Sequence, residues 1–390
     1  MPGAVHTGRW IEQIIDSGWN VHIFSPSPEC DLTIHDSIPN EARLHLVVKQ
    51  RRSRIKQTGI PYPFKKGDRF RLATTKLFEK LTSRAERLAA LIMEIKPDIV
   101  HSLQMQGPSY LTLRAKEIIE SRGKKFPKWI YSSWGSDIYL FSSDKEHAEK
   151  IRNVLRATDF LISDCQRDVD LAREYCFKGE LLGIYPTGGG FEVEKQQRLT
   201  SGPTGSRKII AVKGIMRSEN VGRATVALDA LDQCARELEG YHVVVYSAES
   251  EALKKALSLK ERGRIDLTIF PQSTHDEFVK LLGNTRISIG LNISDGTPNT
   301  MLESMMMGAF PIQSDTVSTR EWIEHGVNGL LVSPDDPNDL ADAIREVIND
   351  TEKLERAAKI NQALIRERLE REKVRDEVVG IYRSVLEETV

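Results

Sequence analysis

Short runs of apolar, β-branched residues alternate along most of the chain with longer stretches in which apolar residues recur every three or four positions. The short runs are typical of buried strands and the longer stretches of amphipathic helices. Strands that alternate with helices in this way form parallel sheets covered by helices, so we expect an α/β fold. In the first half the pattern predicts strands at residues 21–25, 44–48, 99–103, 129–133 and 160–163, and helices at 8–17, 69–95, 110–121, 146–156 and 167–174.

The alternation starts again after residues 198–206, a stretch rich in Gly, Ser, Thr and Pro that has no periodicity and is typical of a linker. We therefore expect two Rossmann-like domains at 1–197 and 207–368, a linker at 198–206 and a terminal helix at 369–390. For the second half the pattern predicts strands at 209–212, 242–247, 267–270, 287–291, 310–313 and 330–332, and helices at 223–237, 250–258, 275–282, 299–307, 319–325, 337–349 and 351 to about 388.

The N-terminal end departs from this pattern, because the predicted helix at 8–17 leads into the strand at 21–25 and no strand precedes it. In a doubly wound sheet that preceding strand is central. We therefore expect that the natural start lies upstream of Met1, or that the first half is assembled abnormally. Mass spectrometry of the N-terminus of the native protein distinguishes the two.

Charge is divided unevenly between the halves. The whole chain has a net charge of −1, but residues 1–190 contain 29 Lys and Arg against 23 Asp and Glu. A basic half can attract an anionic partner or a membrane surface, whereas for any single charge a solvated loop is the better explanation. The densest cations of this half are Lys49, Arg51, Arg52, Arg54, Lys56, Lys65, Lys66, Arg69 and Arg71.

The cysteines and the apolar runs bear on location. Cys30, Cys165, Cys176 and Cys234 lie far apart without a C-x-x-C pair, which favours neither a zinc site nor a disulfide framework. No apolar stretch approaches the roughly 18 to 20 residues that cross a bilayer, and no signal-peptide core is present at the N-terminus. We expect a cytoplasmic protein that either is soluble or lies peripherally on the inner face of a membrane, with no nucleic-acid partner.

The segment LNISDGTPNTMLESMMMGAFPIQSD carries the most chemical information. A strand ends at Leu291, an Asp-Gly turn follows, and a helix begins, which places the turn at the carboxyl edge of a parallel sheet, where ligands bind. Thr297 is a candidate N-cap and Pro298 a candidate first helical residue. The amides of Asn299 and Thr300 would then stand at a helix N-terminus, which attracts anions such as phosphate.

Two carboxylates flank this helix start. Asp295 stands at the strand exit and Glu303 lies one turn into the helix, so together they could accept hydrogen bonds from ligand hydroxyls. A well-capped helix after a turn explains Thr297, Pro298 and Gly308 without any ligand. The spacing alone leaves these two interpretations open.

The same segment resembles the signature of retaining GT-B glycosyltransferases of family 4, the glycosyl transferases of group 1. In that signature two acidic residues, here Asp295 and Glu303, are separated by seven others, and a small-residue helix, a glycine and a strand with proline follow. The resemblance implies that Glu303 binds the ribose of a nucleotide sugar, that Asp295 binds its sugar, and that the amides of Gly296, Thr297, Asn299 and Thr300 face the sugar and diphosphate. Asp295 replaces a commoner Glu and Pro298 a small residue, so the identity of the sugar stays open.

Other segments extend the resemblance over nearly the whole chain. HTGRWIEQIIDSGWNVHIFS resembles the first helix and second strand of the family, KPDIVHSLQ an acceptor-domain strand, and SSWGSDIYLF a loop that faces the donor. The resemblance implies donor-facing roles for Ser136 and Asp137, although Trp134 stands where many relatives have a histidine. His6 and Gly8 would lie where donor phosphate or acceptor approaches, while helix capping explains His6 nearly as well.

The resemblance also implies cations beside the leaving diphosphate, for which Lys213 and Arg223 are the first candidates and Arg217 the third. Each of the three could equally be a surface charge. Gly188 to Gly190 resemble the interdomain loop, where we expect a hinge, and His101 is either a core residue or faces the cleft. The terminal helix would cross back to the first domain.

The activity implied by the resemblance is the transfer of a hexose from a nucleotide diphosphate sugar to a hydroxyl acceptor, a glycan or a lipid-linked molecule, with the anomeric configuration retained. We expect no cofactor and no metal, and a role in the biosynthesis of an envelope, capsule or other glycan. Two alternatives keep the fold: a sugar-nucleotide 2-epimerase, which needs acid and base groups at the sugar, and a non-catalytic binding protein for nucleotide sugars.

Overall fold

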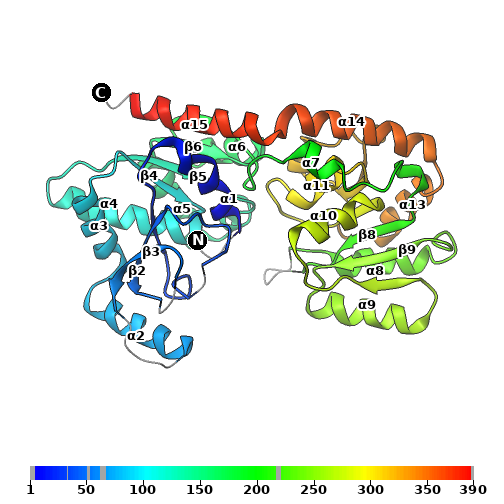
Figure 1. Ribbon diagram of the computed structural model, residues 1–390, viewed down its shortest axis with the longest axis horizontal. Helices are drawn as coiled ribbons and strands as arrows, with labels where there is room; N and C mark the ends of the chain where they lie inside the picture. Colours follow the sequence, from blue (N-terminus) through cyan, green and yellow to red (C-terminus); the bar gives the residue numbers. More distant parts are fainter. Residues whose placement is uncertain (1–4, 33, 51–52, 62–66, 217–220, 388–390) are drawn as a thin grey trace. The chain divides into compact units, whose positions relative to one another are not determined.

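The computed structural model describes residues 5–32, 34–50, 53–61, 67–216 and 221–387. The chain divides into two compact units, one made of Met1–Gly190 with Glu372–Val390 and the other of Phe191–Arg371. Both contain parallel strands connected by helices, which confirms the expected α/β fold (Figure 1). The division falls directly after Gly190, at the end of the predicted hinge glycines.

The first unit alternates helices and strands from its first described residue. Its elements are α1 (Val5–Ile14), the 3-10 turn η1 (Ile15–Ser17), β1 (His22–Phe24), β2 (Arg43–Val48), β3 (Lys56–Ile60), α2 (Asp68–Leu81), α3 (Arg84–Ile95), β4 (Ile99–Leu103), the π-helical turn η2 (Met105–Ser109), α4 (Tyr110–Ser121), β5 (Lys128–Ser132), η3 (Phe141–Ser143), α5 (Lys145–Ala157), β6 (Phe160–Ser163), α6 (Gln166–Glu174), β7 (Glu180–Ile184) and α15 (Arg371–Glu387).

The strands of this unit form two separate parallel sheets. Within the described residues, β1, β2 and β3 pair in that order in one sheet, and β4, β5, β6 and β7 pair in that order in the other. Trp129 and Tyr131 of β5 are fully buried in the core of the second sheet. In the described residues, no strand precedes α1 and none pairs with both β1 and β4.

The prediction of one helix over residues 69–95 was wrong, because the structure divides it into α2 and α3. Ser83 adopts an extended conformation between them and its hydroxyl accepts a hydrogen bond from the amide of Glu86. The Glu86 carboxylate in turn accepts from the amide of Ser83 at 2.8 Å, which completes a capping box. Strands β3 and β7 were not predicted, since neither has a run of β-branched residues.

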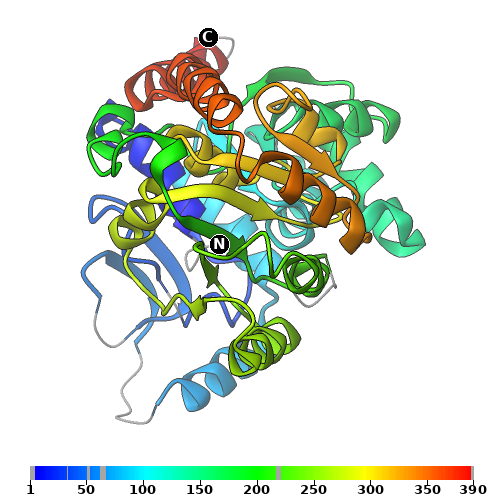
Figure 2. The same cartoon turned by 90° about the vertical axis from the view of Figure 1, so that its right-hand side faces the viewer.

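The second unit contains one parallel sheet between helices (Figures 1 and 2). Its elements are α7 (Val193–Gln197), η4 (Thr204–Ser206), β8 (Ile209–Lys213), α8 (Ala224–Gln233), β9 (His242–Tyr246), α9 (Ser250–Arg262), β10 (Leu267–Ile269), α10 (His275–Gly283), β11 (Thr285–Gly290), α11 (Asn299–Met306), β12 (Phe310–Ser314), α12 (Val317–Arg320), β13 (Leu330–Val332), α13 (Pro337–Val347) and α14 (Thr351–Leu369).

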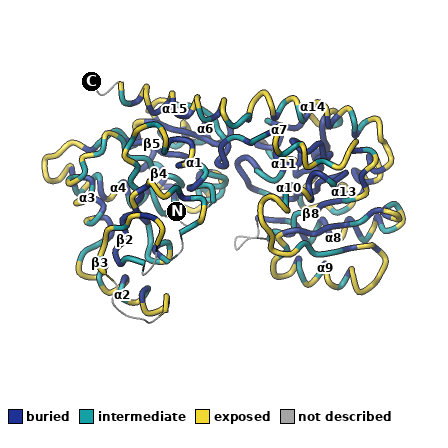
Figure 3. Tube along the Cα trace, in the orientation of Figure 1, coloured by how far each residue is buried: buried dark blue, intermediate teal, exposed yellow. Residues whose placement is uncertain are grey.

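The order of the strands in this sheet is β10-β9-β8-β11-β12-β13 for the described residues. Alternate residues of β11 point to opposite faces of the sheet. Ile287 and Ile289 lie in the apolar cluster formed with α8, α9 and α13, whereas the hydroxyl of Ser288 contacts Ser304 of α11 at 2.8 Å. Helix α11 therefore covers the other face. The strands are buried while much of α9 faces solvent (Figure 3).

The segment 198–206, expected to be a linker, belongs instead to the second unit, although most of its residues are exposed. Thr204 donates a hydrogen bond to the carbonyl of Gly308 at 2.6 Å, and the amide of Gly205 donates to the Glu355 carboxylate at 2.6 Å. The buried Arg207 donates to the carbonyls of Thr285 and Met307. Small polar residues here form hydrogen bonds with neighbouring backbone groups. A linker is rich in the same residue types, so the sequence did not distinguish the two.

Two helical boundaries also differ from the prediction. The helix expected at 319–325 is the shorter α12, which begins after Thr316 and ends at Arg320. The terminal helical region is interrupted at Glu370, whose extended backbone separates α14 from α15. The terminal helix belongs to the first unit from Glu372 onward, where Tyr382 accepts a hydrogen bond from the Trp10 indole at 3.0 Å.

Candidate functional site

The carboxyl ends of three neighbouring strands of the second unit, β8, β9 and β11, lie side by side at one edge of the sheet. Val212 of β8 is opposite Ile289 of β11, and Lys213 is opposite Tyr246 of β9. Since all three strands are parallel, the last residues of each come together at this edge. Open α/β sheets bind ligands at this position.

Lys213 and Asp295 meet at this edge. The Lys213 ammonium lies 3.8 Å from the Asp295 carboxylate, and both side chains are largely buried, with exposed fractions of 11% and 13%. The other carboxylate oxygen of Asp295 accepts a hydrogen bond from the amide of Gly296 at 3.1 Å. The hydroxyl of Ser318 donates to the Asp295 carbonyl at 2.9 Å and holds the turn in place. Two residues that lie far apart in sequence are thus adjacent in the structure.

Helix α11 begins one residue later than expected. Pro298 is the N-cap, with an extended backbone and no side-chain capping bond, so the prediction that Thr297 caps the helix was wrong. The first helical amides are those of Asn299 and Thr300, which have no intrahelical acceptor in an α-helix. The amides of Met301 and Leu302 are satisfied by the carbonyl of Pro298. The predicted helix start is therefore present, with Pro298 in place of Thr297 as its N-cap.

Glu303 is buried one turn further into α11 and has a partner that the sequence did not indicate. Its carboxylate lies 2.7 Å from the Nε2 atom of His275, the first residue of α10. The side chain of Glu303 is 5% exposed and that of His275 38% exposed. The helix predicted at 275–282 begins at His275 as expected, after a capping box formed by Thr274 and Glu277. That His275 lies opposite Glu303 was not predicted.

Arg223 lies beside the exit of β11 but already has an ionic partner. The amide of Arg223 donates to the carbonyl of Leu291 at 3.0 Å, and Gly222 bridges Asn292. A side chain at Gly222 would lie 1.9 Å from the carbonyl oxygen of Ile215, which explains the glycine. The guanidinium of Arg223 pairs with Asp335 at 2.5 Å. Arg217, the third predicted cation, lies outside the described residues.

In the first unit, the loop after β5 contains Trp134, Ser136 and Asp137. The rings of Trp134 and His6 pack edge to face with their centroids 6.1 Å apart. His6 at the start of α1 and the 134–137 loop are therefore in contact. Trp134 and Ser136 are half-buried, whereas Asp137 is 2% exposed.

The carboxylate of Asp137 is directed into the fold. Its Oδ2 atom accepts hydrogen bonds from the amide of Met105 at 2.8 Å and the amide of Trp134 at 3.1 Å, and from the hydroxyl of Tyr131 at 3.3 Å. Burial raises the pKa of Asp137 to about 8 against the opposing effect of the two backbone hydrogen bonds. This geometry fits a residue that positions the 134–137 loop better than one that contacts a substrate.

A pair of substitutions tests this positioning role. Because the pKa of Asp137 is about 8 when folded and about 3.8 otherwise, its contribution to stability is complete below pH 4 and is lost as pH rises through 8. We expect the thermal midpoint of the wild-type protein to fall between pH 5 and 8.5, and that of Asp137→Asn to fall less. The turnover of this variant should stay within about tenfold of wild type. Asp137→Ala should cost about 1 to 3 kcal/mol by leaving buried amides unsatisfied. Equal loss of turnover in both variants, with Asp137→Asn stably folded, would instead assign the charge a direct role.

The remaining predicted positions of the first unit have structural partners. A Cβ atom on Gly8 would lie 1.9 Å from the Ser37 hydroxyl, so Gly8 allows the close packing of α1 against this loop. His101 is a core residue, because its ring nitrogens lie 2.6 Å from the Tyr382 hydroxyl and 2.8 Å from the Ser132 hydroxyl. Desolvation lowers the pKa of His101 to about 3, so the ring is neutral.

The basic run of the first unit is partly used inside the fold. The guanidinium of Arg54 donates to the carbonyls of His35, Asp36 and Ile38, and that of the buried Arg71 donates to the carbonyl of Asp31. Lys56 and Arg69 are exposed. Arg51, Arg52, Lys65 and Lys66 lie outside the described residues.

One group of side chains in the described residues has the spacing of metal ligands: Asp164, Cys165 and Asp168, all buried. The Oδ2 atom of Asp164 accepts a hydrogen bond from the amide of Gly135 at 2.7 Å, and the Oδ1 atom of Asp168 accepts one from Arg167 at 2.7 Å. Burial raises the pKa of the Cys165 thiol, which opposes the thiolate that a metal requires. The group fits a structural network better than a metal site.

In the described residues, no helix combines the length and apolar character needed to cross a bilayer.

Residues 207–350 match the family described as glycosyl transferases group 1, and residues 2–165 match the family described as glycosyl transferase 4-like. The two matched ranges include most of both units. No curated protein sequence matches the chain.

Solved glycosyltransferase structures are similar to this chain over nearly its whole length. HepE from Anabaena in complex with UDP and glucose has a TM-score of 0.68 at 14% identity, with 98% of this chain and 97% of that chain covered. Sucrose-phosphate synthase from Thermosynechococcus elongatus has a TM-score of 0.67 at 14% identity, with 98% and 93% covered. A glycosyltransferase from Rickettsia africae has a TM-score of 0.64 at 14% identity, with 98% and 95% covered. The likeness shows the GT-B fold.

Proposed function

We propose that this chain, a glycosyltransferase of the GT-B fold, transfers a hexose from a nucleotide diphosphate sugar to a hydroxyl acceptor with retention of the anomeric configuration. The proposal rests on the carboxyl edge of the second sheet. There the Lys213–Asp295 pair and the start of α11 meet, and Glu303 is buried one turn further into that helix. HepE, which has a similar structure, was solved with UDP-glucose, and this supports the choice of donor class.

The chemistry of each group matches one part of such a donor. The amides of Asn299 and Thr300 and the positive end of α11 attract the diphosphate. Lys213 adds a positive charge where negative charge develops on the departing phosphate. Asp295 is directed to the hydroxyls of the sugar, and Glu303 accepts hydrogen bonds from the ribose hydroxyls. In this assignment His275 holds the Glu303 carboxylate in its binding orientation.

The reaction needs no protein nucleophile. The bond between the anomeric carbon and the phosphate oxygen breaks, and the acceptor oxygen bonds to the anomeric carbon on the same face. The acceptor proton passes to the departing phosphate. Asp295 and Glu303 bind in this scheme and transfer no proton. The protein positions the reactants and stabilises charge through Lys213 and the helix amides.

The acceptor is a glycan or a lipid-linked hydroxyl compound. The excess of Lys and Arg in residues 1–190 supports an anionic acceptor or contact with an anionic membrane surface. Biosynthesis of an envelope, capsule or other glycan uses acceptors of this kind. Peripheral membrane contact through the first half is part of the same proposal.

A panel of nucleotide sugars tests the proposal. Each is incubated with glycan and lipid-linked acceptors, release of nucleoside diphosphate is measured, and the anomeric configuration of the product is determined by NMR. We expect acceptor-dependent release for one class of donor, a product with the donor's configuration, and no loss of rate when EDTA is added. A product epimerised at C2 from donor alone would favour a 2-epimerase. Donor binding without turnover across the panel would favour a binding protein.

A further inference from the structure

Gln104, the first residue after β4, has a backbone conformation that L side chains rarely adopt. Its φ is 86° and its ψ is 149°, at the border of a region that glycine occupies almost alone. We propose that this strain holds the side-chain amide of Gln104 in an acceptor site, where it binds two neighbouring hydroxyls of a sugar. The inference rests on the proposed function and deepens it, because it names the chemical class of the reacting end of the acceptor.

Neighbouring groups fix the backbone of Gln104 from both sides. Its amide donates a hydrogen bond to the carbonyl of Ser132, the last residue of β5, at 3.0 Å. Its carbonyl accepts from the amide of Ser109 at 3.3 Å and from the hydroxyl of Ser109 at 2.8 Å. Ser109 is fully buried at the end of η2. A strained conformation persists where the surroundings hold it in this way, and such conformations cluster at ligand sites.

The position of Gln104 is one at which ligands bind. Strands β4 and β5 are parallel, with Leu103 opposite Ser132, so Gln104 lies at the carboxyl edge of their sheet. The π-helical turn η2 follows directly, and turns of this kind are frequent at functional sites. Asp137 joins the turn to the 134–137 loop, because its carbonyl accepts a hydrogen bond from the Gln106 side chain at 2.7 Å. Gln104, η2 and this loop therefore form one connected rim.

Two amide groups on this rim have hydrogen-bonding capacity to spare. Gln104 is half-buried, and within the residues that the structure describes no hydrogen bond joins its side chain to another group. The side-chain oxygen of Gln106 is buried and has no partner among the same residues. Buried polar atoms in folded proteins are normally paired with protein, water or a ligand. A ligand rich in hydroxyls would supply partners to both amides.

The chemistry of an amide favours a sugar over other acceptors. The side chain of Gln104 offers a donor nitrogen and an acceptor oxygen side by side, and each hydroxyl of a ligand can both donate and accept. Two neighbouring hydroxyls of a sugar therefore satisfy both ends of the amide at once. A lipid alcohol with one hydroxyl satisfies only one end. The amide is neutral, so it gives no preference for a phosphate.

Two substitutions separate the strain from the amide. Gln104→Gly removes both, because glycine adopts positive φ readily, and it should raise the thermal midpoint by roughly 2 to 4 °C. Gln104→Ala removes the amide and keeps the strain, so its midpoint should not rise. Both variants should raise the KM for the acceptor by about tenfold or more and leave the KM for the donor within about twofold. A merely structural role would not produce this combination of higher stability and weaker acceptor binding.

Methyl glycosides of common hexoses serve as acceptors in these assays, each beside analogues that lack one hydroxyl. We expect the wild-type protein to prefer the intact glycoside over one of its deoxy analogues by about tenfold, and both Gln104 variants to lose that preference. Lys96→Gly is the matched control, since Lys96 also has a positive φ, of 52°, but precedes β4. It should raise the midpoint in the same way and leave the acceptor KM unchanged.

Binding of the same glycosides, followed by NMR line broadening, gives a readout that does not need turnover. Equal binding or an equal acceptor KM in wild type and both Gln104 variants would overturn the inference and leave the proposed function standing. Wild-type protein that binds none of the glycosides, or that uses a simple alcohol as well as a glycoside, would also overturn it. Glycoside binding that depends on Gln104, without transfer from any nucleotide sugar, would support the site and contradict the proposed function.

Discussion

Replacement of Glu303 by alanine is expected to lower the specificity constant for the sugar donor by about two to four orders of magnitude. A carboxylate that accepts hydrogen bonds from two ribose hydroxyls contributes roughly 1.5 to 3 kcal/mol for each. Glu303 is 5% exposed and is held by His275 at 2.7 Å, so its orientation is set before the donor arrives. These bonds form equally in the bound donor and the transition state, so the loss should be mainly a raised KM. Steady-state kinetics with the preferred donor measures it.

Two further variants separate the carboxylate from its partner. Glu303→Gln keeps the shape of the side chain and one acceptor oxygen, so we expect a loss between those of wild type and Glu303→Ala. His275→Ala removes only the positioning contact and should cost about tenfold, again in KM. Circular dichroism should show the same fold for all three proteins. An unchanged specificity constant in a folded Glu303→Ala variant would refute the assignment of Glu303 to the donor site.

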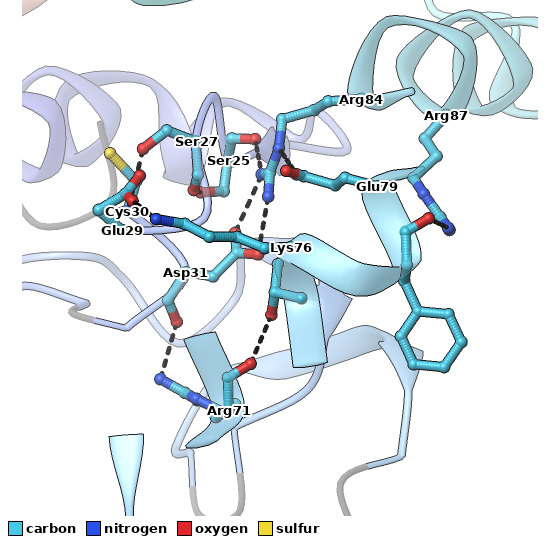
Figure 4. Close-up of polar contacts among 12 residues, drawn as sticks. Ser25, Ser27, Glu29, Cys30, Asp31, Arg71, Lys76, Glu79, Arg84 and Arg87 are labelled. Atoms are coloured by element: carbon cyan, nitrogen blue, oxygen red, sulfur yellow. Dashed lines mark hydrogen bonds and ion pairs between the residues drawn. The ribbon is translucent and has the colours of Figure 1, made fainter. Parts of the chain in front are cut away.

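Replacement of Arg84 by alanine is expected to destabilise the first unit by about 3 to 5 kcal/mol. Arg84 lies at the start of α3 and pairs through both terminal nitrogens with the carboxylate of Asp31, at 3.0 and 3.1 Å (Figure 4). It also donates to the carbonyl of Ser25 at 2.6 Å and pairs with Glu79 at 2.5 Å. Asp31 is 1% exposed, so loss of Arg84 leaves a buried carboxylate without its cation.

The stability of this unit can be followed by tryptophan fluorescence in urea, because Trp10, Trp19, Trp129 and Trp134 all belong to it. Arg87→Ala is the matched control, since Arg87 lies one turn further along α3 (Figure 4) and donates to the carbonyls of Phe78 and Thr82 at 3.2 and 3.3 Å. We expect that variant to lose about 1 kcal/mol or less. A change for Arg84→Ala no larger than that for Arg87→Ala would show that Asp31 is solvated when the pair is broken.

Much of the secondary structure follows from local pattern. Strands β4, β6 and β13 and helix α4 have the predicted boundaries, because their apolar periodicity and end residues agree. The apolar pattern did not predict element boundaries where a helical period continues across a break between two helices. Residues 69–95 keep a helical period through Ser83, and only the capping box there divides α2 from α3. Strands β3 and β7 have too few β-branched residues to be distinguished from loops.

The local features of the candidate site could be predicted from the sequence, whereas the contacts between its elements could not. The helix start after Asp295 could be predicted because an N-terminus and its turn are local features of the sequence. The pairing of Glu303 with His275, and of Arg223 with Asp335, joins residues on different elements. Hydrogen bonds across such distances depend on the sheet order, which local periodicity does not contain. The burial of Asp137 against the amides of Met105 and Trp134 is a case of the same kind.

The sequence by itself determined the α/β class, most strands and helices, and the segment from Asp295 to Glu303 as the place to look for a ligand. Only the tertiary structure decided which residues meet: the parallel order of β9, β8 and β11 brings Lys213 to Asp295, and the split of the first sheet leaves a cavity between β1 and β4. The reason is that periodicity reports which face of an element is buried, whereas contacts between elements are set by how those faces pack.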